Sequence, residues 1–140
     1  MIEEFSRVIV KDSLGECLVI RDREEVWNFP GGKRELNETA ETCAIREVEE
    51  ELNLKIQDLE EIYSGSFRFD NVEWLGHFYF AATASGRPTL NEPGKIKGIQ
   101  FIKNLDSVQF SPQLKKLLNY LTSHRVLDSR ETIWGCVAKF

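Results

Sequence analysis

The stretch from Gly31 to Leu54 constrains the chain most, because it gathers negative charge into one short segment. Residues 47 to 51 hold four glutamates and no lysine or arginine. Like charges at helical spacing destabilise a helix by roughly a few tenths of a kcal/mol per pair. A helix face that meets only solvent usually alternates lysine with glutamate. We therefore expect these carboxylates to hold a cation, and a divalent metal ion is the first candidate.

The residues around the glutamates predict a helix that starts at Thr39 and ends at Asn53. Asn37 and Thr39 are both good N-caps, and Thr39 is favoured because Glu41 then lies in the first turn and suits the helix dipole. Asparagine tolerates the left-handed conformation that often ends a helix. If Asn53 does no more than this, its exchange for glycine should be neutral or slightly stabilising.

At about 100° per residue, this helix has an apolar face and a separate carboxylate face. The carboxylate face comprises Glu47, Glu50 and Glu51. Arg46 precedes Glu50 by four residues, a spacing that allows an ion pair. The turn Pro30-Gly31-Gly32 lies directly ahead of the helix and could bring backbone carbonyls to a bound ion. Mg²⁺, or alternatively Mn²⁺, takes such oxygen ligands and can activate water for attack at phosphorus.

The composition limits the class of protein. A length of 140 residues, with 41% hydrophobic residues, fits one domain spanning 1–140 with a sizeable core. The net charge of −5 gives no general attraction for nucleic acid or an anionic membrane. No apolar run approaches the roughly 20 residues of a membrane span. The three cysteines are far apart, so we expect no disulfide framework. We expect a cytoplasmic protein, either a monomer or a homodimer.

Apolar runs elsewhere predict mostly β-structure. The expected strands are 5–11 and 17–20, paired as a hairpin, followed by 26–29, 54–56, 61–69, 73–82 and 99–102. The run 73–82 is apolar on both faces in places, so it should be a central strand. A second helix is expected after Ser111-Pro112, and the tail 125–140 should add a strand or pack over the core. The loop from Ser85 to Gly98 is long enough to be functional.

The stretch from Gly32 to Leu54 resembles the Nudix box, a motif written G-x5-E-x7-R-E-U-x-E-E-x-G-U, in which U is a bulky aliphatic residue. Gly32 and Glu38 have the required spacing, and residues 46–48 (Arg-Glu-Val) and 50–51 (Glu-Glu) complete the charged part. The single departure is Asn53, where the box has its second glycine. Because asparagine tolerates the same left-handed geometry, this departure concerns helix termination and leaves the chemistry intact.

The resemblance implies an α/β (α+β) fold, arranged as an α/β/α sandwich around a mixed β-sheet. It also implies metal-dependent hydrolysis of a nucleoside diphosphate linked to some group X. On the matching positions, the metal ligands would be Glu47, Glu50 and Glu51, and the Gly32 carbonyl could complete the metal's coordination. Arg46 would orient the glutamates by ion pairing.

The resemblance does not identify the residue that acts as the general base. Glu47 is the position that acts as the base in some members, and Glu38 would support the site indirectly. Other members take the base or a further ligand from a loop in the second half. Here that loop is residues 85–98, whose only acid is Glu92.

The box does not specify X. Arg7, Arg23 and Arg68 are candidate phosphate contacts. The residues that could line a slot for a base are Phe5, Arg7, Trp27, Phe69, Trp74, Phe78 and Trp134, although most of them should be core. The size resembles that of compact members that convert nucleoside triphosphates to monophosphate and pyrophosphate. The alternatives are an ADP-ribose or nucleotide-sugar pyrophosphatase, an enzyme for an inositol or isoprenoid pyrophosphate, and a non-catalytic nucleotide sensor.

Overall fold

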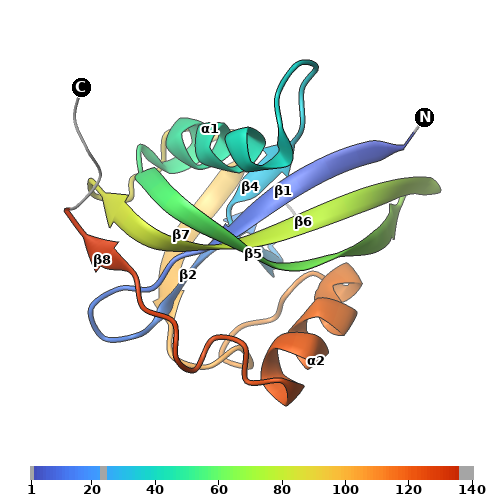
Figure 1. Ribbon diagram of the computed structural model, residues 1–140. Coiled ribbons are helices and arrows are strands. Elements are labelled where there is room, and N and C mark those ends of the chain that lie inside the picture. Colours follow the sequence, from blue (N-terminus) through green and yellow to red (C-terminus); the bar gives the residue numbers. More distant parts are fainter. Residues whose placement is uncertain (1, 23–24, 136–140) are drawn as a thin grey trace.

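The computed structural model describes residues 2–22 and 25–135. Two β-sheets form its centre, and the helices α1 (Ala40–Leu52) and α2 (Lys115–Ser123) lie on opposite sides of them (Figure 1). The predicted α/β/α sandwich with a mixed sheet is confirmed, and a second, antiparallel sheet accompanies the mixed one. No helix in the described part combines the length and apolar character needed to cross a membrane.

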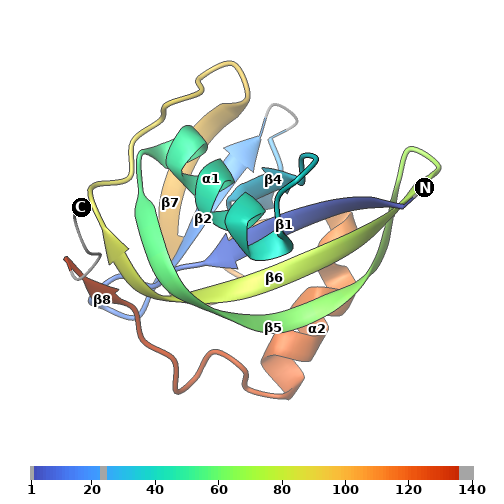
Figure 2. The ribbon, with the colours of Figure 1, turned by 45° about the horizontal axis from the view of Figure 1, so that its top comes forward.

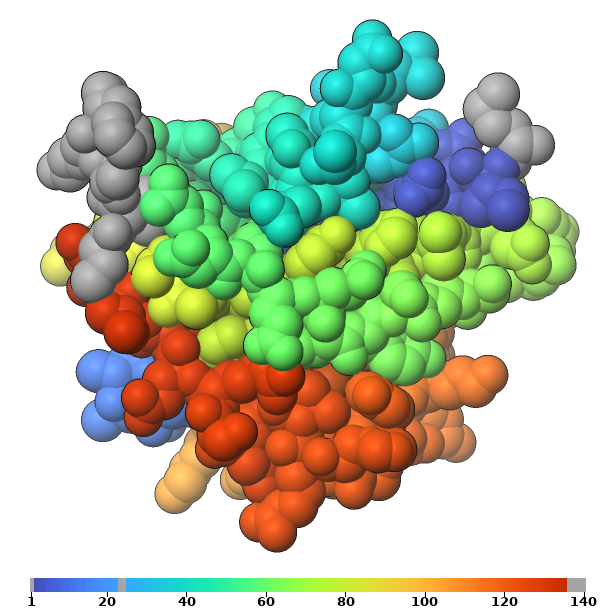
Figure 3. All heavy atoms as spheres, in the orientation of Figure 1, coloured from blue at the N-terminus to red at the C-terminus, as the bar shows by residue number. Residues whose placement is uncertain are grey.

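The mixed sheet has the order β4-β1-β6-β5, and β8 also pairs with β6. Its strands are β1 (Glu3–Ile9), β4 (Gly31–Lys33), β5 (Lys55–Phe69), β6 (Val72–Ser85) and β8 (Ile133–Trp134). Strand β6 runs parallel to β1 and β8 and antiparallel to β5, which confirms the prediction of a central strand. In Figure 3, β5 crosses the surface between α1 and α2. Strand β8 confirms that the tail adds a strand, while residues 136–140 lie outside the described part.

The smaller sheet has the order β3-β2-β7 and is antiparallel. Its strands are β2 (Cys17–Asp22), β3 (Trp27–Asn28) and β7 (Ile96–Ile102). The predicted hairpin of 5–11 with 17–20 is confirmed only next to its turn, where an antiparallel bridge joins Lys11 and Cys17, while β1 and β2 themselves belong to different sheets. The chain does turn back at 12–15, and Leu18 donates to the Val10 carbonyl at 2.9 Å. The two strands then separate into different sheets, and each strand contributes one face to each of the two cores.

A second difference concerns the strands predicted at 54–56 and 61–69. They are one strand, β5, with a register shift between Glu61 and Tyr63. Asp58 adopts a positive φ of 55° within this strand and does not end it. The interruption in the apolar pattern therefore marks irregular positions in one long strand. This strand and β6 meet at the predicted turn, Asp70-Asn71, where both residues have positive φ.

The ends of α1 match the prediction. The Thr39 hydroxyl accepts the Thr42 N–H at 3.0 Å, and Asn53 is left-handed with φ 56°. The apolar face of α1 packs into one core through Ala44, Val48 and Leu52. The second core lies on the other side of the mixed sheet, where Leu114, Leu117 and Leu121 from the 3₁₀ turn (Pro112–Leu114) and α2 cover it.

Aromatic rings fill one end of this second core. Phe5 contacts Phe67, Phe69, Trp74 and Phe78 edge-on, with ring centroids 5.3–6.1 Å apart. Gly76 of β6 provides the room for this packing. A Cβ there would lie 2.5 Å from Phe5 Cζ and 2.7 Å from Phe67 Cε1. Because a fully packed core cannot absorb such overlap, the glycine is required for the ring cluster to form.

We predict that Gly76→Ala lowers the free energy of unfolding by about 1 to 3 kcal/mol, the usual cost of overpacking. The matched control is Gly65→Ala, because Gly65 is the direct partner of Gly76 across β5 and β6. Its Cβ would come no closer than 3.4 Å, to the Tyr63 ring. Urea denaturation measures both variants. An equal loss in the two would contradict the packing explanation.

Candidate functional site

The sequence Pro30-Gly31-Gly32, predicted as a turn, has only a bend at Pro30, and its two glycines begin strand β4, which pairs with β1. The carboxylate face of α1 meets β4 at these glycines. The Gly31 N–H donates to Glu51 Oε1 at 3.0 Å. At Gly32 the approach is closer, because a Cβ would lie 1.4 Å from Glu47 Oε2. The Gly32 carbonyl accepts the Cys43 thiol at 3.4 Å and so also faces α1. The double glycine therefore lets the backbone of β4 lie directly against two of the predicted ligands.

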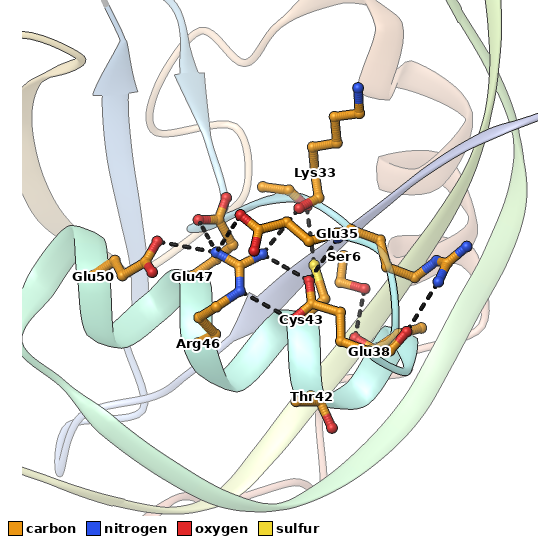
Figure 4. A network of polar contacts seen from close by, with 12 residues as sticks. Ser6, Lys33, Glu35, Glu38, Thr42, Cys43, Arg46, Glu47 and Glu50 are labelled. Carbon is orange, nitrogen blue, oxygen red and sulfur yellow. Dashed lines mark hydrogen bonds and ion pairs between the residues drawn. The ribbon is translucent and has the colours of Figure 1, made fainter.

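Arg46 joins the acids of the motif into one network (Figure 4). Its Nε and Nη2 donate to the two carboxylate oxygens of Glu38 at 3.0 and 2.7 Å. Its Nη1 donates to Glu47 at 3.1 Å and to Glu50 at 3.0 Å. The predicted i,i+4 ion pair with Glu50 is thus present. Nη2 also donates to the Lys33 carbonyl at 3.1 Å, which links the network to β4.

This network shifts the pKa values of Glu38 and Arg46 in the expected direction. Hydrogen bonds from Arg46 lower the pKa of Glu38 to about 2. Hydrogen bonding to Glu38 and the charges of Glu47 and Glu50 in turn raise the pKa of Arg46. Glu38 is therefore ionised throughout the neutral range and acts as a permanent anchor for the guanidinium.

Glu47 and Glu51 show the opposite behaviour. Burial raises the pKa of Glu51 to about 7, against the charge of Arg7 and the hydrogen bond from Gly31. Burial and the hydrogen bond with Glu50 raise the pKa of Glu47. Among the described residues, no Lys, Arg or His nitrogen forms an ion pair with Glu51. A buried carboxylate without a cation in contact carries a large desolvation cost.

The donor set at this face fits a hard divalent cation. It consists of carboxylate oxygens and a backbone carbonyl, which are the ligands that Mg²⁺ prefers. A cation here would also remove the cost of keeping Glu51 and Glu47 ionised in a buried place. In the described part of the chain, no three His, Cys, Asp or Glu side chains are already arranged as a metal cluster. The reason is visible in the contacts, since Glu50 and Glu47 turn to Arg46 and Glu51 turns to Gly31.

The structure places the three arginines that were candidate phosphate contacts very differently. Arg7 lies on β1, is half-buried, and donates to the Phe29 carbonyl at 2.8 Å. Burial lowers its pKa, while the charges of Glu51 and Glu47 oppose that shift, so Arg7 belongs to the carboxylate region. Arg68 is exposed on β5, and by strand alternation it faces away from Phe67 and Phe69. The structure does not bring Arg68 to the site, and Arg23 lies outside the described residues.

A pocket of about 270 Å³ opens beside the carboxylates. Its lining residues are Phe5, Arg7, Gly32, Lys33, Phe69 and Trp74. Gly32 and Arg7 are shared with the carboxylate region, so the two sites adjoin. Lys33 Nζ lies 5.8 Å from the centroid of the Trp74 ring. The Trp74 indole N–H is buried without a hydrogen-bond acceptor in the described structure.

Of the aromatic residues that the sequence offered for a base slot, Phe5, Phe69 and Trp74 line this pocket, whereas Trp27, Phe78 and Trp134 do not. Sequence reasoning missed Lys33, for which the available signal was its position directly after the double glycine. Sequence reasoning also missed Asn91 and Lys95, which lie in the loop between β6 and β7. The Lys95 charge lowers the pKa of Glu47, and the Glu92 charge raises that of Glu51, so this loop lies within electrostatic reach of the carboxylates.

Comparison with known proteins finds similarity along most of the chain. A family model described as the NUDIX domain matches residues 6–121. A MutT NUDIX hydrolase from Burkholderia pseudomallei aligns with a TM-score of 0.76 and 22% identity, over 85% of this chain and 97% of that one. The E. coli ORF135 protein aligns at 0.77 and 19%, over 91% and 94%. A MutT protein from Methanosarcina mazei Go1 aligns at 0.78 and 14%, over 89% and 95%. At such identities these structures establish the fold.

We predict that Gly32→Ala leaves the protein folded but weakens Mn²⁺ binding by about 10- to 100-fold. The new methyl group would take the place of the Glu47 carboxylate, which must turn away. The matched control is Gly98→Ala, where a Cβ would come no closer than 3.6 Å, to Arg21. Titration of Mn²⁺ by electron paramagnetic resonance measures both. Unchanged affinity in Gly32→Ala would exclude Glu47 from the metal site.

A second prediction concerns Glu38, whose pKa of about 2 in the folded protein lies below the ordinary glutamate pKa of 4.5. A lowered carboxyl pKa contributes stability that is complete above pH 4.5 and is lost as the pH falls towards 2. Glu38→Gln should therefore lower the free energy of unfolding at pH 7 by about 1 to 2 kcal/mol. The difference in the free energy of unfolding between Glu38→Gln and the wild type should become smaller when urea denaturation is repeated at pH 3.

The control for Glu38 is Glu35→Gln. Glu35 lies in the same loop, but its side chain is 69% exposed and 3.9 Å from Arg46. Such exposed pairs contribute little, so this variant should match the wild type at both pH values. A deficit in Glu38→Gln that persisted unchanged at pH 3 would contradict the charge-based explanation.

Proposed function

The chain belongs to the Nudix domain family, and we propose that this hydrolase cleaves a phosphoanhydride bond in a nucleoside diphosphate linked to a further group X. We propose Mg²⁺ as the cofactor, with Mn²⁺ as a substitute, and one domain of 140 residues built around the box at 32–54. The substrate we favour is a nucleoside triphosphate, converted to the monophosphate and pyrophosphate.

The observation that carries this proposal is the meeting of the α1 carboxylates with Gly31 and Gly32 of β4. Glu47, Glu50 and Glu51 would hold the metal ion from one side, and the Gly32 carbonyl, which faces α1 at Cys43, would complete its coordination. When bound, the ion would neutralise phosphate charge and lower the pKa of a coordinated water. Arg46 would keep Glu47 and Glu50 within reach of the ion, since it contacts both. Either Glu47 or Glu92 would accept the proton of the attacking water.

The adjoining pocket supports a nucleotide as the substrate. The rings of Phe5, Phe69 and Trp74 offer apolar faces of the kind on which a planar base can lie. The buried Trp74 N–H lacks an acceptor, and a carbonyl or ring nitrogen of a base would supply one. Arg7 and Gly32 line the pocket and also border the carboxylates, so a bound base would be close to the phosphates at the metal.

The test is a product screen with the full chain and Mg²⁺ over nucleoside triphosphates, dinucleoside polyphosphates, ADP-ribose and nucleotide sugars. We expect release of pyrophosphate from at least one triphosphate. Turnover confined to ADP-ribose or nucleotide sugars would overturn the favoured substrate while retaining the reaction class. Calorimetric binding of nucleotides without any turnover would instead indicate a sensor.

We predict that Glu50→Gln lowers kcat by at least about 100-fold, because the carboxamide loses the charge that neutralises the metal ion. The matched control is Glu49→Gln. Glu49 is the preceding residue, its side chain is 49% exposed, and it pairs with Lys55 at 3.3 Å. Circular dichroism should show both variants folded. Wild-type turnover in Glu50→Gln would remove Glu50 from the metal site.

A further inference from the structure

The loop between β6 and β7 lies beside the C-terminal turn of α1 (Figure 2) and is hydrogen-bonded to it. The Thr89 N–H donates to the Leu52 carbonyl at 2.9 Å, and the Asn91 N–H donates to the Glu51 carbonyl at 3.0 Å. The Asn91 side-chain amide donates to the Glu50 carbonyl at 2.9 Å. Carbonyls in the last turn of a helix lack partners within the helix, and this loop satisfies three of them.

Asn53 adds a second set of contacts from the helix side. It occupies the left-handed position that ends α1, with φ 56° and ψ 30°. Its Nδ2 donates to Thr89 Oγ1 at 2.9 Å and to Asn91 Oδ1 at 3.2 Å. A glycine at this position could end the helix equally well but could make neither bond. The single departure of this chain from the Nudix box therefore supplies a tie between α1 and the loop.

The hydrogen-bonded segment, residues 89–91, ends directly before Glu92. The backbones of Asn91 and Glu51 are hydrogen-bonded, and the Glu92 charge acts on the Glu51 carboxyl. Glu92 lies 3.7 Å from Lys95 Nζ, and the Lys95 charge acts on Glu47. The Glu92 side chain is half-buried, with 30% of its surface exposed. The tie thus fixes the place from which an acid of this loop can approach the carboxylate face.

We propose that Asn53 and Asn91 are positioning residues, which hold Glu92 at the carboxylate face of α1 as the proton acceptor for water. This inference rests on the proposed function. In the step, the water oxygen bonds to phosphorus as the bridging P–O bond breaks. The electron pair of that bond leaves with the departing phosphate group, and the proton of the water passes to the Glu92 carboxylate. Asn53 and Asn91 touch neither water nor phosphate.

The first experiment tests the tie without needing activity. Asn53→Asp keeps the size of the side chain and a residue type that tolerates the left-handed region, but removes both donors. We expect the amide hydrogens of Thr89 and Asn91 to exchange about tenfold faster in native-state NMR measurements. The matched control is Asn71→Asp, at another left-handed asparagine, φ 64°, in the β5–β6 turn. It should leave both amides unchanged. Equal exchange in Asn53→Asp and wild type would overturn the tie.

The second experiment tests positioning through a double-mutant cycle with Glu92→Gln. We expect Asn53→Asp to lower kcat about tenfold with KM unchanged, and Glu92→Gln to lower it by about 100-fold. If Asn53 acts through Glu92, the double variant should lose no more than Glu92→Gln alone. Losses that multiply, or an unchanged kcat in Glu92→Gln, would overturn the positioning role.

The two proposals fail in distinguishable ways. Absence of turnover by the wild type over the whole substrate panel would overturn the proposed function, and the role of Glu92 with it. Turnover by the wild type with multiplying losses would overturn the positioning role and leave the proposed function intact. Asn91→Ala provides a second variant, and its kcat loss should likewise disappear in the Glu92→Gln background.

Discussion

The close approach of the Gly31-Gly32 backbone to α1 is the constraint on which the site depends. No other residue type at Gly32 would leave room for the Glu47 carboxylate, and the Gly31 amide is the donor that Glu51 has in its buried position. The same approach brings the Lys33 carbonyl within reach of Arg46, and β4 in turn pairs with β1, which carries Arg7. The carboxylates, Arg46 and the aromatic pocket are therefore assembled around the three residues of β4.

Local sequence signals predicted the elements that carry this chemistry. Thr39 and Asn53 define both ends of α1 as expected, because capping depends on residues adjacent to the helix itself. The ion pair of Arg46 with Glu50 follows from helical spacing alone. The approach of Gly32 to Glu47 was only suggested by the order of the elements along the chain. Its closeness depends on how β4 pairs with β1 beneath α1, which is a tertiary property.

Features that depend on pairing between distant segments were predicted less well. Strands 5–11 and 17–20 have the composition of a hairpin, yet β1 pairs in parallel with β6, about 70 residues away, because both of its faces must be buried. The contacts of Asn53 with Thr89 and Asn91 are equally remote in sequence. From the sequence alone, Asn53 is only a departure from the motif. Its second role becomes clear only when the structure shows that its side chain contacts Thr89 and Asn91.

The same residue thus ends the helix and holds the loop, and these two tasks have different energetic consequences. Ending the helix requires only a residue that tolerates positive φ, for which glycine and asparagine are nearly equivalent. Holding the loop requires donors, and the side chain of Asn53 supplies them at a rim where water competes for each bond. Two exposed hydrogen bonds of this kind are strong enough to order the loop, but each contributes only a small stabilisation. These hydrogen bonds restrict the ten-residue loop that carries Glu92 to one position, which an unattached loop of that length would not keep.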